Sequence, residues 1–232
     1  MTIAFGELES VVSEGLVADI FRVERSVAML SAIGLRASEI NSGPGNFGDL
    51  FGALQDALTT EAILSIARVY DVPSKEYPTR CIRGVLEYLD QHQLISIREP
   101  YQLKLALRSM SAPAVLLDCV DSNSQKFSLA FVKFVRARMD EPEQVENLKK
   151  LRQLRDKALA HNEHVISIEG PTWEAIAELT NIAKQTIGVL GWAYFSTGYM
   201  ANGEYTLTDD ANRAAFSLNR LFDKLYGSPL VK

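Results

Sequence analysis

The sequence predicts an all-α protein, a helical bundle with long antiparallel helices and short additional helices. Apolar residues recur at steps of three and four through most of the chain, which is the spacing of one helix face. The connections between these segments are short and rich in glycine, proline or polar residues. The chain has 232 residues, of which 47% are hydrophobic and 23% charged, so it is long enough to bury a core.

The first half of the chain predicts three helices. The first runs from about Leu8 to Leu30, the loop 41–46 ends it, and a second runs from Phe47 to Tyr70. A third covers residues 79–92, and the stretch 93–112 fits either a helix or a short extended piece. The residues that we expect to face inward from the first two helices are Leu8, Val12, Leu16, Ile20, Val23, Val27, Leu30, Phe47, Leu50, Phe51, Leu54, Leu58, Ile63, Ile66 and Tyr70.

The second half predicts further helices with clear start signals. One begins near Ser124, and Pro142 starts another that runs to about His161, because proline is tolerated in the first helical turn. A long helix follows residues 170–172, and its buried face should include Trp173. Thr208 should cap the last helix. The expected inner face of that helix consists of Ala211, Ala214, Leu218, Phe222 and Leu225.

Composition excludes several classes of protein. The net charge of −5 argues against a general nucleic-acid-coating protein, which would be basic. Residues 1–10 lack the basic and apolar regions of a secretory signal, and no apolar run reaches the roughly 20 residues of a membrane span. Cys81 and Cys119 are too few for a disulfide framework. We therefore expect a cytoplasmic protein without a membrane segment, built as one domain over residues 1–232, and the sequence leaves open a helical insertion over 73–125.

No cofactor or metal site is predicted. The glycine-rich stretch 43–48 lacks the Lys-Ser/Thr pair of a phosphate-binding loop, so a hinge between helices is the better interpretation. The sequence contains no His-Glu-x-x-His or Glu-x-x-His pattern for zinc or di-iron. The sequence therefore contains no motif typical of zinc or di-iron enzymes or of proteins with a phosphate-binding loop.

One motif carries chemistry, and it lies near the end of the helix that starts at Pro142. Arg155 supplies a fixed positive charge, and His161, one of three histidines, can exchange a proton near neutral pH. On an ideal helix these two side chains are about 120 degrees and about 9 Å apart, too far to hold one phosphate together. Either the helix is distorted or the motifs of two chains meet across a dimer interface, and we favour the dimer.

The charges around this motif allow two interpretations. Basic side chains gather in residues 133–157, mixed with acidic ones. A solvated helix face explains such a pattern, and a local anion-binding patch is the alternative. An arginine in this position can also anchor helix packing through an acidic partner, and a histidine is favourable at a helix carboxyl end. Spacing alone does not separate these interpretations from catalysis.

The run from Leu151 to His161 resembles the signature of HEPN domains (higher eukaryote and prokaryote nucleotide-binding). These domains carry an arginine, a polar residue after it and a histidine four to six positions beyond the arginine. The chain resembles most closely the abortive-infection U group, in which a long first helix precedes a second that ends like residues 59–71. The likeness in helix order covers residues 5–226, but only the motif matches the family at the level of individual residues.

The resemblance implies a metal-independent endoribonuclease that works as a homodimer, with both motifs lining one cleft. Arg155 would stabilise the scissile phosphate, His161 would act as general base or acid, and Asp156 would orient one of them. A toxin or antiphage role, with an antitoxin or other regulatory protein as partner, is also implied. RNA affinity would come from the basic patch, and the candidate RNA-binding residues are Lys149, Arg152 and Lys157.

The chain departs from the family pattern at one position. Some HEPN toxins carry a tyrosine two positions after the histidine, where a nucleotidyltransferase partner modifies it, and this chain has Glu163 there. Regulation of that kind is therefore not expected. The rival function is a non-catalytic helical module that binds a protein or nucleotide, with Arg155 and His161 in a structural ion pair or an interface.

Overall fold

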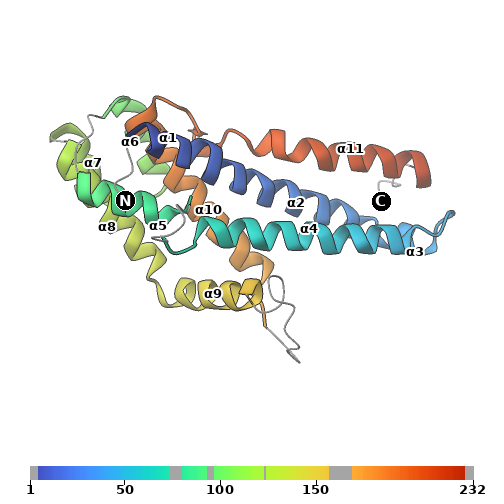
Figure 1. The fold of residues 1–232 in the computed structure, drawn as a ribbon. Helices are drawn as coiled ribbons and strands as arrows, with labels where there is room; N and C mark the ends of the chain where they lie inside the picture. The colour runs from blue at the N-terminus through green and yellow to red at the C-terminus, as the bar shows by residue number, and fades with distance from the viewer. Residues whose placement is uncertain (1–4, 74–79, 93–96, 123, 157–168, 228–232) are drawn as a thin grey trace. The chain divides into compact units, whose positions relative to one another are not determined.

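The computed structural model describes residues 5–73, 80–92, 97–122, 124–156 and 169–227. These residues are almost entirely helical, and the strands among them form a single two-stranded sheet (Figure 1). The predicted all-α class is therefore confirmed. No helix in these ranges is long and apolar enough to cross a membrane.

The helices follow the predicted order, with several boundaries that the sequence did not predict. Short π-helical segments adjoin two of the longer helices: η1 precedes α2, and η3 follows α10. The elements are α1 (Phe5–Ser10), η1 (Val11–Leu16), α2 (Val17–Leu35), α3 (Ala37–Ser42), α4 (Gly48–Val69), α5 (Ile82–His92), α6 (Pro100–Ser109), α7 (Ala114–Ser122), α8 (Ser124–Met139), α9 (Pro142–Gln153), α10 (Trp173–Leu190), η3 (Gly191–Phe195), β1 (Met200–Ala201), β2 (Glu204–Tyr205) and α11 (Thr208–Tyr226).

The chain divides into two compact units. The first consists of residues 1–20 and 66–206, as far as they are described, and the second of residues 21–65 and 207–232 with the same restriction. Helices α2 and α4 contribute residues to both units. The expectation of one domain with an insertion over 73–125 stays a prediction.

Helix α10 supplies much of the core of the first unit. It contacts α6, α9 and the small sheet, and its face from Ile176 to Leu190 is buried as the sequence predicted. Thr172 caps its first turn by accepting a hydrogen bond from the amide of Ala175, at 3.2 Å. Within the same core, the hydroxyls of Tyr194 and Ser128 are hydrogen-bonded at 2.7 Å. Both residues are buried, so this bond satisfies the polar atoms that they bring into the core.

The second unit has its own apolar core. The rings of Phe51 and Phe222 lie 5.1 Å apart, among buried side chains of α2, α4 and α11. Arg36 is buried beside this core and pairs with Glu39 and Asp223. The hydrogen bond that Arg36 donates to Glu39 raises the pKa of Arg36 against the opposing effect of burial. This arginine therefore stays charged while it anchors α11.

The hinge predicted at 43–48 is a loop between α3 and α4. Its backbone is left-handed at Gly45 and Asn46, with φ of 101° and 51°. At Gly43 a side chain would meet the carbonyl oxygen of Glu39 at 2.3 Å, so only glycine fits this position without a shift of the backbone.

Several detailed predictions were wrong. Helices α3 and α7 and the small sheet were not predicted, while the stretch 93–112, which the sequence left open, contains helix α6. Thr208 is the first residue of α11 rather than its cap, and its hydroxyl donates to Oε1 of Glu24 at 3.0 Å. Some residues expected to face inward are exposed instead, because periodicity alone does not fix the width of a buried stripe. They are Val27, Leu50, Trp173 and Leu225.

The Phe222→Ala substitution should lower the free energy of unfolding by about 3 to 5 kcal/mol, because it leaves a cavity against Phe51. Urea unfolding of the full chain measures this loss. The control is Phe216→Ala on the same helix, which should change stability by less than about 0.5 kcal/mol, since Phe216 is 57% exposed. Equal losses for the two variants would contradict the assignment of the core.

Candidate functional site

The motif begins where regular α-helix ends. Helix α9 starts at Pro142 as predicted, buries Leu148 and Leu151, and ends at Gln153. Residues 154–156 continue as a π-helical turn, so the chain departs from regular α-helix at the start of the motif. The distortion near His161 that the spacing left open, and the alternative of a dimer, stay predictions. Lys157 and His161 lie outside the described residues.

Arg155 is held by two carboxylates. Its Nε donates to Oδ1 of Asp156 at 2.6 Å, and its Nη1 lies 3.0 Å from Oδ2 of Asp71. The hydrogen bond with Asp156 raises the pKa of Arg155, burial opposes this, and Asp71 raises the pKa further. The side chain is 22% exposed, so the guanidinium is fixed in direction but still open to solvent.

The position of Asp71 depends on the residue before it. Tyr70 is buried at the end of α4, and its hydroxyl donates to the carbonyl oxygen of Leu179 in α10 at 2.6 Å. Burial raises the pKa of this hydroxyl, so it remains a proton donor. Asp71 then accepts a hydrogen bond from the amide of Val72 at 2.9 Å, through Oδ1. Its second oxygen is the one that faces Arg155.

Asp71 is the site residue that sequence reasoning missed. The sequence showed it only as the end of the second helix and part of the family-like segment 59–71. No spacing rule connects it with Arg155, since the two are far apart in the chain. The useful signal was an acidic residue directly after a buried tyrosine at a helix end, in a chain whose motif arginine needed a partner.

Arg152 lies one turn before Arg155 and has a different environment. Its Nε and Nη2 atoms are buried and make no hydrogen bond to the described residues. Burial lowers the pKa of Arg152, and the charges of Arg83 and Arg155 lower it further, while Asp71 opposes them. This brings Arg83 of α5 into the cluster, a residue that the sequence did not single out.

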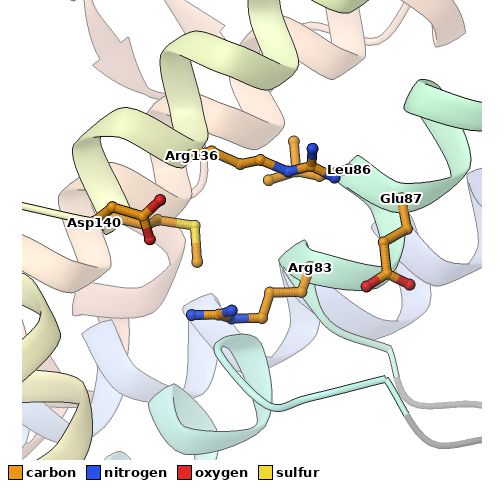
Figure 2. A pocket seen from close by; sticks show the side chains of 6 residues that line it. Arg83, Leu86, Glu87, Arg136 and Asp140 are labelled. Atoms are coloured by element: carbon orange, nitrogen blue, oxygen red, sulfur yellow. The ribbon is translucent and has the colours of Figure 1, made fainter.

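Arg83 also borders a pocket between α5 and α8. The pocket is lined by Arg83, Leu86, Glu87, Arg136, Met139 and Asp140. Figure 2 shows the Arg83 side chain extending from α5 toward the Asp140 side of the pocket, with the Glu87 carboxylate pointing away from it. Arg136, from the opposite wall, is bonded to Asp90 at 3.1 Å.

The predicted RNA-binding residues separate into two kinds. Lys149 is exposed on α9, and its only described partner is Glu146, at 3.4 Å. Arg152 is partly buried and belongs to the arginine cluster instead. Lys149 therefore has the environment of a solvated helix face, and Arg152 lies partly buried among other charged groups.

Together these residues form a small charged cluster. We call the side chains of Asp71, Arg83, Arg152, Arg155 and Asp156 the arginine cluster. Three guanidinium groups and two carboxylates leave it one positive charge in excess. In this acidic protein the cluster can attract a phosphate locally, although the chain as a whole repels nucleic acid.

The comparison with protein families agrees with the resemblance to HEPN domains. The family model of the HEPN proteins described as AbiU2 matches residues 7–216. The chain belongs to the AbiU2 family of HEPN proteins. Neither a search of curated proteins nor a search of solved structures gives a significant match. The AbiU2 match spans both compact units and includes every member of the arginine cluster.

A double-mutant cycle should detect the ion pair between Asp71 and Arg155. The Asp71→Asn and Arg155→Gln substitutions should couple by about 1 kcal/mol in urea unfolding, because the pair is partly buried. The exposed pair Glu146 and Lys149 is the control, and its coupling should stay below about 0.5 kcal/mol. A coupling of Asp71 with Arg155 no larger than this control would show that the pair does not hold the motif.

Proposed function

We propose that this AbiU2-family protein is a metal-independent endoribonuclease that acts as a homodimer. The observation that carries the proposal is the AbiU2 match over a chain that contains the Arg155-Asp156 and His161 motif. The fixed and solvent-open guanidinium of Arg155 supports it, because such a group can meet a phosphodiester with little loss of entropy.

The proposed reaction takes its nucleophile from the RNA. The ribose 2′-hydroxyl attacks the adjacent phosphorus, and its proton passes to one imidazole. The bond from phosphorus to the 5′-oxygen breaks, and a second imidazole gives that oxygen a proton. The products are a 2′,3′-cyclic phosphate and a 5′-hydroxyl. Arg155 stabilises the charge that develops on the phosphate oxygens, and Asp156 orients Arg155.

The homodimer follows from the need for two proton-transfer groups. Each chain supplies one His161, and base and acid act on opposite sides of the phosphorus in an in-line displacement. Two chains that face each other supply both groups and two copies of Arg155. We also propose a role in antiphage or toxin–antitoxin defence, with a regulatory protein that blocks this shared cleft.

A second candidate function is the non-catalytic helical module. The specific observation in its favour is that Arg155 pairs with Asp71 and Asp156 within one chain, which is the structural ion pair that this interpretation expects. The two functions differ in what they require of His161. The nuclease needs its imidazole for proton transfer, while the module needs only that the chain fold and bind.

The His161→Ala variant should lose at least about 100-fold in RNA cleavage, because general acid–base catalysis contributes this much. Purified protein is incubated with end-labelled RNA in excess EDTA, and the product ends are tested for a cyclic phosphate. The Arg155→Lys variant keeps a positive charge but loses the forked geometry, so it should lose a similar factor.

Controls separate loss of chemistry from loss of fold. Each variant is checked by urea unfolding and circular dichroism, and Arg213→Gln on α11 serves as an exposed charge change, since the Arg213 side chain is 80% exposed. Equal cleavage by the wild-type protein and His161→Ala would refute the proposed mechanism. A wild-type protein without cleavage, dimeric and folded, would favour the module.

A further inference from the structure

We propose that Arg83 and Arg152 together form a subsite for a second RNA phosphate, beside the scissile phosphate held by Arg155. This inference rests on the proposed nuclease function and deepens it. The two arginines come from different helices, α5 and α9, and neither is the arginine of the HEPN motif, which is Arg155. Their role would be to bind and position the strand rather than to take part in bond breaking.

The first observation is a set of buried donors without acceptors. Nε of Arg83 and both Nε and Nη2 of Arg152 are buried and make no hydrogen bond to the described part of the chain, while both residues remain partly exposed and can be reached from solvent. Leaving such donors unsatisfied is costly, and more so for charged groups. A phosphate has the oxygen atoms and the charge that these donors lack, and forked guanidinium donors match its geometry.

The second observation is the proximity of like charges. Apart from burial, the charge of Arg83 lowers the pKa of Arg152 more than any other charge does, including that of Arg155 on the same helix. Arginine does not relieve such repulsion by losing a proton at physiological pH. An anion that contacts both side chains relieves it. The repulsion therefore favours one shared anion over two separate ones.

The neighbouring carboxylates are already engaged. Asp71 accepts from the amide of Val72 and from Arg155, and Asp156 accepts from Arg155. In the pocket of Figure 2, Glu87 points away from Arg83, and no hydrogen bond or ion pair within the described residues joins Asp140 to Arg83. Within the described residues these carboxylates do not supply an acceptor for the two arginines, and an external anion would supply one.

The position of the subsite fits a polymer better than a free anion. Arg152 precedes Arg155 by almost one helical turn, which corresponds to about 5 Å along the axis. This rise is of the same order as the spacing of neighbouring phosphates along an extended strand. A strand whose scissile phosphate lies at Arg155 thus carries its next phosphate close to Arg152 and Arg83.

The test measures binding of an RNA that cannot be cleaved. A fluorescent single-stranded oligonucleotide with 2′-O-methyl groups at every position lacks the nucleophile, and its Kd is measured by anisotropy over a range of salt concentrations. The variants are Arg83→Gln, Arg152→Gln and the double variant. The matched control is Arg80→Gln, which removes an exposed arginine that is paired with Glu14, three residues before Arg83.

The expected result is a loss of one phosphate contact in the double variant. Each single variant should weaken binding by about tenfold. In the double variant the slope of log K against log salt should become shallower by about 0.7 in total, the value for one phosphate on a single strand. Arg80→Gln should leave the slope within error of the wild-type value.

Other outcomes would overturn the proposal in distinct ways. An unchanged slope in the double variant would mean that no RNA phosphate meets these arginines. A total change of about 1.4 would mean that each arginine binds its own phosphate. Inorganic phosphate alone is tested by thermal shift, and stabilisation that the double variant loses without any change in the RNA slope would assign the site to a free anion.

The design separates this inference from the nuclease proposal. A wild-type protein that cleaves RNA while the double variant keeps its salt slope would overturn only the subsite. A wild-type protein that neither cleaves nor binds RNA would overturn both. If the double variant fails to fold, Arg83→Gln combined with Arg152→Lys replaces it, and the weakened binding should persist because lysine cannot reproduce the forked contact.

Discussion

The candidate site depends on the contact of Arg155 with Asp71 and Asp156. A guanidinium group near the surface is normally mobile, and fixing it costs side-chain entropy. Here the cost is offset by two carboxylates, one adjacent in sequence and one brought by α4. The buried bond from Tyr70 to Leu179 fixes the end of α4 and with it the second carboxylate. The direction of the motif arginine is therefore set jointly by its neighbour Asp156 and, through Asp71, by the core.

The same contact explains how an acidic protein can present a site for an anion. The net charge of −5 disfavours long-range attraction of RNA. In the arginine cluster, partial burial strengthens local electrostatic interactions, and three arginines face only two carboxylates. Affinity for a phosphate can then be local and geometric.

The ion pairs of Arg155 are compatible with both candidate functions, and this is a physical consequence of preorganisation. A guanidinium that must meet a transition state benefits from being held in advance, and one that only supports the fold is held in the same way. The buried donors of Arg83 and Arg152, by contrast, do not fit both functions equally well. Buried donors without an acceptor in the described residues do not add to stability through hydrogen bonds, and this is the observation on which the proposed phosphate subsite rests.

The sequence by itself determined the helical class, the helix order and the motif, because apolar periodicity and helix start signals such as Pro142 act between near neighbours. It did not determine which side of each helix was covered, so Leu50 and Trp173 proved exposed. It did not place Asp71 or Arg83 beside the motif, since the residues concerned lie far apart in the chain. Only the tertiary structure decided them, because long-range pairing depends on how all the helices pack at once.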